Sequence, residues 1–288
     1  MKSWNETAAV FAEMARLKAE GRVCALATLT KIEGSAYRKP GARLLIRDDK
    51  SLVGNVSGGC LEEDLRDRAV RVMESGKAER VHYDTGSDED VLWGLGLGCN
   101  GKIDIHLERG PVDGLETILE KLASQEPFDI TAGDFTETLR PPAQLVVIGA
   151  GDDAIPVVQL ATEAGFRVTI VDHRASHLTK DRFPDAWRAV QRRPEAGLTG
   201  LPQDANTLVV IMNHHLIRDR DWAVKFLPTP VRFIGLLGPI ARRNEILKAI
   251  PAEHHTRYHG PVGLPIAAEG PVQIAVSIVA QLLQAVGR

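Results

Sequence analysis

The sequence predicts an α/β protein with two domains, the second of which is built on a doubly wound parallel sheet. From residue 144 onward, short apolar segments alternate with stretches of helical periodicity, and this alternation is typical of βαβ units with right-handed crossovers. The apolar segment 145–148 also runs directly into the turn Gly149-Ala150-Gly151-Asp152-Asp153-Ala154. A strand that leads into a helix through such a glycine turn indicates a Rossmann-like domain. The 288 residues leave room for a smaller α/β domain in front of it.

The pattern of apolar residues predicts the elements of both domains in chain order. An amphipathic helix around residues 10–17 precedes a buried strand at 23–29, because the latter segment is short and almost continuously apolar. Apolar residues at helical spacing in 61–73 predict a helix that ends near Gly76. The other expected elements are strands at 43–47, 51–54, 80–83 and 102–107 in the first domain, and in the second domain strands at 145–148, 166–171, 208–212 and 231–236 with helices at 154–164 and around Trp222.

Residues 125–142 are predicted to be a linker between a first domain at 1–124 and a Rossmann-like domain at 143–288. Hydrophobic periodicity weakens in this segment, Gly133 is followed by scattered threonines, and Pro141-Pro142 ends it. Such a composition is typical of connecting segments.

Composition and charge limit the classes of function. Hydrophobic residues make up 44% and charged residues 25% of the chain, the balance of a globular protein. A net charge of −3 without a block of Lys and Arg argues against nucleic acid as the partner. We recognise no signal peptide and no membrane span, so we expect no membrane partner and a cytoplasmic protein. The segment 273–286 is apolar on most of its circumference, which burial within the chain and a homodimer interface explain equally well.

The glycine turn of the second domain leaves two alternatives open. Gly149 permits the tight turn, Gly151 lets a pyrophosphate approach the backbone, and Asp172 ends the next strand where a carboxylate usually binds a ribose hydroxyl, which favours NAD over NADP. Asp152 and Asp153, however, would repel a phosphate at the helix start. A tight corner between strand and helix also requires glycine for steric reasons alone.

His214 is a candidate ligand contact, because it follows the strand 208–212 at the carboxyl edge of the sheet, where open α/β sheets bind ligands. A surface turn in which His214 and His215 cap the following helix explains the same residues.

The three cysteines, Cys24, Cys60 and Cys99, are too few and too widely spaced for a disulfide framework or a paired zinc site. Cys24 lies in a continuously apolar segment and is expected to be a core residue. Cys99 lies among glycines in the segment 94–101 and could approach Cys60 in space.

The segment 54–60, Gly-Asn-Val-Ser-Gly-Gly-Cys, lies between a predicted strand and a predicted helix. Unpaired backbone amides and the helix dipole at such a place stabilise an anion, so we expect Cys60 to carry a thiolate. Gly58 and Gly59 leave room for a metal-oxo group or a phosphate to reach the backbone.

Arg38, Lys39 and Arg43 are three cations in the glycine-containing loop 34–43. They could clamp a phosphate, for which arginine is the better bidentate partner. A solvated basic turn is the alternative.

Several of these motifs, in their order along the chain, resemble the XdhC/CoxI family. The first domain resembles the family's N-terminal signature through Glu33-Gly34-Ser35, Pro40-Gly41-Ala42-Arg43 and the segments 54–62 and 94–101. The second resembles its Rossmann domain through Gly149-Ala150-Gly151-Asp152-Asp153-Ala154, Val171-Asp172-His173-Arg174, Gly235-Leu236-Leu237-Gly238-Pro239 and Pro261-Val262-Gly263-Leu264. Pro265 and Gln273 depart from the usual pattern, which puts any ligand role there in doubt.

The resemblance implies a maturation factor that binds the molybdenum cofactor (molybdopterin), supports its sulfuration by a cysteine desulfurase, and delivers it to an apo molybdenum hydroxylase such as a xanthine dehydrogenase or aldehyde oxidoreductase. It also implies that Cys60 binds this cofactor, with Glu62 in the matching position beside it. The expected cofactor-binding residues are therefore Cys60, which is also the expected metal ligand, and Ser57, Gly58, Gly59, Glu62, Arg38, Arg43, Cys99, Gly149, Gly151, Asp172 and His214.

Two other functions stay open at this point. One is an NAD-dependent oxidoreductase acting on a small molecule, which needs a proton donor or acceptor near the nicotinamide, with His214 as the candidate. The other is a scaffold that joins a desulfurase to an apo-enzyme without binding the cofactor.

Overall fold

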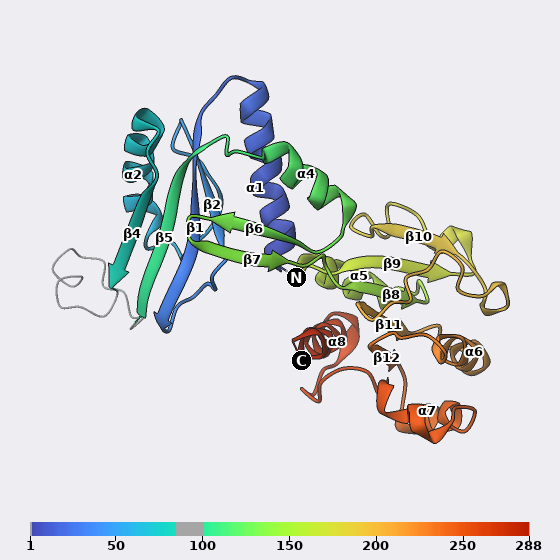
Figure 1. Cartoon of the computed structure of the whole chain (residues 1–288). Helices are drawn as coiled ribbons and strands as arrows, with labels where there is room; N and C mark the ends of the chain where they lie inside the picture. The colour runs from blue at the N-terminus through green and yellow to red at the C-terminus, as the bar shows by residue number, and fades with distance from the viewer. Residues whose placement is uncertain (1, 85–100, 288) are drawn as a thin grey trace. The chain divides into compact units, whose positions relative to one another are not determined.

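The computed structural model describes residues 2–84 and 101–287 (Figure 1). The chain divides into two units, Met1–Pro141 and Pro142–Arg288. Each unit has its own sheet, and each is described by itself.

An antiparallel sheet of five strands forms the centre of the N-terminal unit, in the order β3-β2-β1-β5-β4. Helix α2 (Glu62–Ser75) packs against one face of this sheet. Helices α1 (Lys2–Ala19) and α4 (Leu115–Ser124) pack against the other face. The strands are β1 (Cys24–Gly34), β2 (Arg43–Arg47), β3 (Leu52–Gly54), β4 (Glu79–Asp84) and β5 (Gly101–Gly110).

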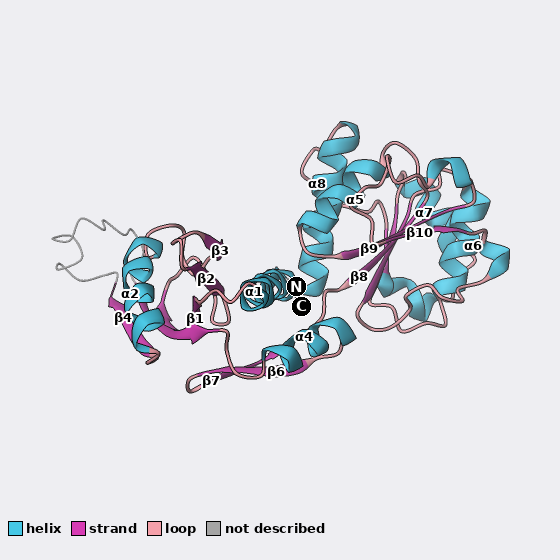
Figure 2. Ribbon diagram, turned by 90° about the horizontal axis from the view of Figure 1, so that it is seen from above, coloured by secondary structure: helices cyan, strands magenta, loops and turns pink. Residues whose placement is uncertain are grey.

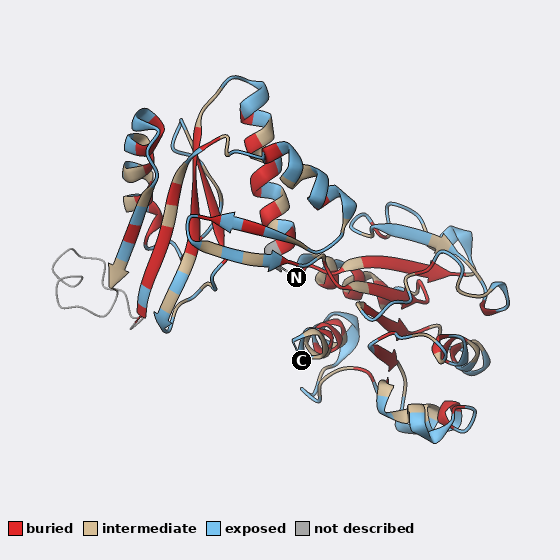
Figure 3. Cartoon of the chain, viewed as in Figure 1, coloured by how far each residue is buried: buried red, intermediate tan, exposed pale blue. Residues whose placement is uncertain are grey.

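Burial of the central strand β1 on both faces of the sheet explains why its first part is continuously apolar. Ala25, Ala27 and Leu29 pack in the core under α2, whereas Cys24 and Leu26 pack in the core under α1. A strand buried on both faces has no polar side to alternate with. Beyond residue 29 the strand is partly exposed as far as Gly34, as Figure 3 shows.

The structure differs from the predicted linker at 125–142, because residues 128–139 form an antiparallel hairpin. Its strands are β6 (Phe128–Ala132) and β7 (Phe135–Leu139). Ile130 and Leu139 are buried in the core that contains α1. The alternation of one buried and one polar residue is a strand pattern, but in five-residue segments it is easily mistaken for a loop.

The C-terminal unit contains a six-stranded parallel sheet with helices on both faces. Its order is β10-β9-β8-β11-β12-β13, which becomes 3-2-1-4-5-6 when the strands of this unit are numbered from β8, the strand order of a Rossmann fold. Figure 2 shows α5 (Ala154–Glu163) and α8 (Gly270–Val286) on one side of the sheet, and α6 (Leu216–Phe226) and α7 (Ile240–Leu247) on the other. The predicted fold class is therefore confirmed. The strands are β8 (Gln144–Ile148), β9 (Arg167–Asp172), β10 (Arg188–Gln191), β11 (Thr207–Ile211), β12 (Phe233–Leu236) and β13 (Tyr258–His259).

Helix α8 buries one side and exposes part of the other. Ala275, Ile278 and Leu282 are buried, whereas Val272 and Leu283 are exposed. Within residues 2–84 and 101–287, no helix is long and apolar enough to cross a membrane.

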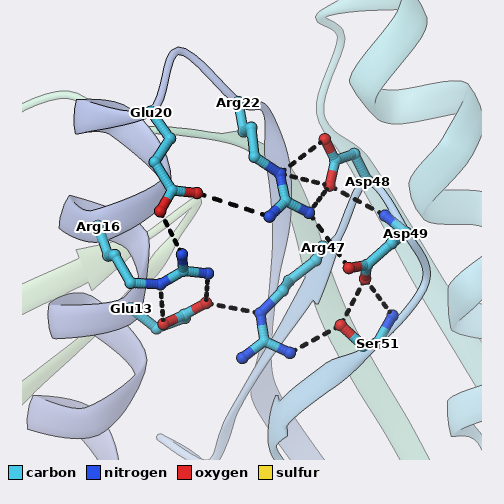
Figure 4. Close-up of polar contacts among 8 residues, drawn as sticks. All are labelled: Glu13, Arg16, Glu20, Arg22, Arg47, Asp48, Asp49 and Ser51. Atoms are coloured by element: carbon cyan, nitrogen blue, oxygen red, sulfur yellow. Dashed lines mark hydrogen bonds and ion pairs between the residues drawn. The ribbon is translucent and has the colours of Figure 1, made fainter.

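A network of ion pairs joins α1 to the turn between β2 and β3 (Figure 4). The Glu13 carboxylate accepts hydrogen bonds from Arg16 at 2.7 Å and from Arg47 at 2.6 Å. The hydrogen bond from Arg16, followed by the one from Arg47, lowers the pKa of Glu13 from 4.5 to about 2. Arg22 pairs with Asp48 in the same network.

We predict that the N-terminal unit loses stability in acid through Glu13. Because its folded pKa lies below its unfolded value, the ionised carboxylate stabilises the fold above pH 4.5 and this contribution disappears as the pH falls toward 2. Glu13→Gln should therefore lower the thermal midpoint at neutral pH. On acidification, the thermal midpoint of this variant should fall less than that of the unmodified chain. Calorimetric scans between about pH 7 and about pH 2 measure both effects.

Glu126→Gln is the matched control, because Glu126 is exposed and forms no ion pair with any described residue. If the thermal midpoints of the Glu13 variant and the unmodified chain fell in parallel with pH, the network would contribute nothing to the acid sensitivity of the fold.

Candidate functional site

Two loops of the N-terminal sheet, the end of β4 and the start of β5 lie at the same end of that sheet. Strands β1 and β5 are antiparallel neighbours, as are β2 and β3, and β4 and β5, so the end of one strand lies beside the start of the next. The loops 35–42 and 55–61, the end of β4 and the start of β5 therefore lie at one end of the sheet. The residue pairs that mark this end are Gly34 with Gly101, Leu44 with Gly54, and Asp84 with Lys102.

The loop 35–42 lies against the start of β5 and beside the loop 55–61. The backbone oxygen of Ser35 lies against Gly101 at the start of β5. A Cβ atom on Gly58 would lie 3.9 Å from ring carbons of Tyr37, whose side chain is 73% exposed. An exposed aromatic ring thus lies beside the Ser-Gly-Gly-Cys segment. Tyr37 is not among the residues predicted from the sequence, although an aromatic residue in a polar loop is a recognisable signal.

Glu62 holds the Ser-Gly-Gly-Cys segment from its buried side. Its carboxylate is buried and accepts hydrogen bonds from the Ser57 amide at 3.1 Å, from the Ser57 hydroxyl and from the Leu61 amide at 3.2 Å. The Ser57 oxygen in turn accepts hydrogen bonds from the amides of Gly59 and Leu61. These contacts close the turn that precedes α2, so Ser57 and Glu62 position the loop and do not face solvent.

Cys60 lies exposed at the surface of this turn. The backbone amides of Gly58 and Cys60 donate to no acceptor in the part of the chain that the structure describes. The Leu61 amide, however, is taken by Ser57 and Glu62. Because Glu62, Glu63 and Asp64 already place negative charge in the first turn of α2, they compete with an anionic sulfur for the helix dipole. The thiolate at Cys60 therefore stays a prediction.

The other two cysteines differ from Cys60. Cys24 is fully buried, and burial, with smaller effects of Asp48 and Glu13, raises the pKa of its thiol to about 11. This confirms the expectation of a core residue. Cys99 and most of the glycine segment around it lie outside the described residues.

Arg38 and Arg43, predicted to clamp a phosphate, are bound to carboxylates of the protein itself. Arg38 pairs with Glu6 of α1. Arg43 is 4% exposed and pairs with Glu137 of β7 at 2.8 Å, so it links the sheet to the hairpin. Lys39 is exposed and forms no ion pair with a described residue, which leaves it as the cation of this loop that is free to bind a ligand.

In the C-terminal unit, Asp172 is a structural residue of the glycine turn. Its carboxylate is 2% exposed and accepts hydrogen bonds from the Ala150 amide at 2.8 Å and from the amide and guanidinium of Arg174. Burial opposes the charged form, but the hydrogen bonds from Arg174 and from both amides outweigh it, so the pKa of Asp172 lies well below its usual range. Both oxygens of this carboxylate thus accept hydrogen bonds from within the protein.

Asp153 fills the space that Gly151 was expected to leave for a pyrophosphate. A Cβ atom on Gly151 would lie 2.6 Å from Oδ1 of Asp153. The other oxygen of this carboxylate lies 2.7 Å from Nε2 of His214, so the residue pair bridges the carboxyl ends of β8 and β11. His215 caps α6 by accepting a hydrogen bond from the Arg218 amide. The structure thus brings together the residues of the predicted site, Gly149, Gly151, Asp172 and His214. Their contacts, however, are with other residues of the protein.

Comparisons with known proteins agree with this architecture. Residues 17–84 match the model of the XdhC and CoxI family, and residues 145–282 match the XdhC Rossmann domain. A Bacillus subtilis protein, named as a probable xanthine dehydrogenase subunit, is 30% identical, over 90% of this chain and 92% of its own length. The Escherichia coli protein named "Molybdenum cofactor insertion chaperone PaoD" is 24% identical, over 94% of this chain and 86% of its own.

A solved structure covers both units. The crystal structure of a protein from Bacillus halodurans, described as a xanthine dehydrogenase, superposes with a TM-score of 0.86 at 29% identity. The match covers 97% of this chain and 96% of the other.

Proposed function

Because the chain belongs to the XdhC and CoxI family, we propose that it is a maturation factor for a molybdenum hydroxylase. It binds the molybdenum cofactor as cargo, supports its sulfuration, and delivers it to an apo-enzyme such as a xanthine dehydrogenase or aldehyde oxidoreductase. The name of the Escherichia coli relative, an insertion chaperone, supports the same role.

The observation that carries this proposal is the exposed thiol of Cys60, which lies on a turn whose buried side is held by hydrogen bonds within the protein. Glu62 and Ser57 hold the turn by hydrogen bonds inside the protein. On the exposed side of the turn, the sulfur of Cys60 and the amides of Gly58 and Cys60 are therefore available to a ligand. Sulfur is a soft ligand suited to a thiophilic metal, and paired amides suit an oxo or phosphate oxygen.

Each exposed group at this end of the sheet has a separate task in the proposal. Cys60 contacts the molybdenum, Gly58 and Gly59 let the cargo approach the backbone, and Lys39 neutralises its phosphate. Cys99 is retained as a second thiol of the site. Arg38 and Arg43 keep an indirect role, because their ion pairs hold the loop 35–42 against α1 and β7.

The proposed partners are the apo molybdenum hydroxylase and a cysteine desulfurase, in the cytoplasm. A second copy of the chain could pack against the exposed apolar residues of α8, Val272, Val276 and Leu283.

We predict that Cys60→Ala reduces the molybdenum retained by the chain at least tenfold when the protein is purified from cells that make the cofactor. Loss of one metal–sulfur contact removes the soft ligand and leaves only weaker oxygen and amide contacts. Metal analysis by mass spectrometry, together with oxidised-pterin fluorescence, measures the bound cargo.

Cys24→Ala is the matched control, because it removes a buried thiol to which the proposal gives no contact with the cargo. It should leave retention unchanged. Equal retention by the Cys60 variant and the unmodified chain would remove Cys60 from the site, and partner binding without any cofactor would favour the scaffold.

The alternative, an NAD-dependent oxidoreductase acting on a small molecule, requires a free glycine turn and a free His214. Asp153 contacts both, and Asp172 is occupied by Arg174 and the Ala150 amide. We therefore predict that calorimetry detects no binding of NAD to the unmodified chain at sub-millimolar concentration, because a carboxylate lies where the pyrophosphate would bind. Saturable binding that His214→Ala abolishes would instead establish the oxidoreductase site.

A further inference from the structure

A cavity of about 240 Å³ lies in the N-terminal unit, between the sheet and the elements that cover its α1 face. Side chains of β1, β2 and β5 form the floor of this cavity. Its roof consists of α1, α4, the loop after β5 and strand β6 of the hairpin. Pockets for drug-sized molecules measure roughly 300 Å³ or more, so this cavity suits a smaller ligand.

Two polar side chains on the floor of the cavity have unmet hydrogen bonds. Thr28 of β1 and Arg43 of β2 are cross-strand neighbours, and they are 0% and 4% exposed. Oγ1 of Thr28 and Nη2 of Arg43 are buried and have no hydrogen-bond partner in residues 2–84 or 101–287. Buried polar groups are nearly always paired, because an unpaired one destabilises the fold. The two groups therefore indicate a ligand that accepts hydrogen bonds.

The charge of Arg43, in contrast, is balanced within the protein. Its other terminal nitrogen, Nη1, pairs with Glu137 at 2.8 Å and donates to the Thr7 hydroxyl at 3.1 Å and to the Gly41 carbonyl at 3.0 Å. An anionic ligand would thus add uncompensated negative charge to the cavity.

Glu108 of β5 is the third polar group that lines the cavity, and it also disfavours an anion. Its carboxylate lies 3.9 Å from Nε2 of His106, too far for a hydrogen bond. Burial, followed by the charge of Asp113, raises the pKa of this carboxyl. An N–H of an uncharged ligand would give the carboxylate a partner without adding charge.

The remaining walls are largely apolar. Phe11 of α1, Leu26 of β1, Ile118 of α4 and Ile130 of β6 line the cavity. Apolar walls with a few convergent polar groups are typical of sites for flat organic molecules, whose faces are apolar and whose edges form hydrogen bonds.

We propose that this cavity binds a planar, uncharged heterocycle whose edge carries a lactam, a carbonyl next to an N–H. The carbonyl accepts hydrogen bonds from Nη2 of Arg43 and from the hydroxyl of Thr28, and the N–H donates to Glu108. The faces of the ring pack against the apolar walls. A free nucleobase and the pterin ring of the proposed cargo share this chemistry.

The cavity does not depend on the proposed function. The residues that line it do not include the turn that carries Cys60. Loss of metal retention in Cys60→Ala and loss of heterocycle binding by the cavity are therefore separate results, and either can fail without the other.

The test is the binding of uracil and of pterin to the full chain, measured by calorimetry. We expect saturable binding of at least one of them, and none of uracil methylated at both ring nitrogens, because that probe has no N–H for Glu108. Thr28→Val should weaken the binding roughly fivefold, the effect of one lost neutral hydrogen bond. The same substitution should raise the thermal midpoint of the ligand-free chain, since it removes a buried hydroxyl that has no partner.

Thr169→Val is the matched control. Thr169 of β9 is also buried, and its hydroxyl also lacks a partner among the described residues, but it belongs to the other unit of the chain. The control should raise the thermal midpoint as Thr28→Val does and leave the binding of the heterocycle unchanged.

The source of the heterocycle is distinguished by denaturing the chain, purified from cells that make the cofactor, and identifying the released molecules by mass spectrometry. A pterin that the Thr28→Val protein lacks identifies the ring of the cargo, and a nucleobase that it lacks identifies the other source.

Three results would each overturn the proposal. The first is no saturable binding of uracil or pterin, and the second is equal weakening of the binding by Thr28→Val and Thr169→Val. The third is tighter binding of benzoate than of either heterocycle, which would make the cavity an anion site of Arg43.

Discussion

The antiparallel pairing of β1 with both β2 and β5 is the constraint on which the N-terminal unit depends. It sends the loop after β1, the loop after β3 and the start of β5 to one end of the sheet. The ion-pair network of Glu13 and Arg47 lies at the other end and holds α1 there. The unit therefore has one end closed by charge pairs and one end that presents a thiol, two unpaired amides and an aromatic ring.

The two glycine turns of the chain show how similar sequences lead to opposite environments. In the turn before α2, a buried carboxylate, Glu62, lies underneath and leaves the outer face accessible. In the turn before α5, the carboxylate of Asp153 lies over Gly151 and is held there by His214. The position of one acid relative to the backbone thus decides whether a glycine turn is open to a ligand.

Much of the fold followed from local pattern, because burial on both faces makes a strand continuously apolar, as in β1, β8 and β11. The hairpin β6–β7 did not, since its strands are short and half polar. For the site, the sequence indicated the exposed turn at Cys60, but it gave no sign that Arg38 and Arg43 are paired with carboxylates of the protein. Their partners, Glu6 and Glu137, lie far from them in the chain, and such long-range pairs leave no local signal.

X-ray absorption at the molybdenum edge of the cargo-loaded chain tests the central claim, that Cys60 contacts the metal, most directly. The unmodified protein should show more sulfur in the coordination shell of molybdenum than Cys60→Ser, in which an oxygen replaces the protein sulfur. Identical sulfur coordination in the two proteins would mean that the cargo is held by other groups.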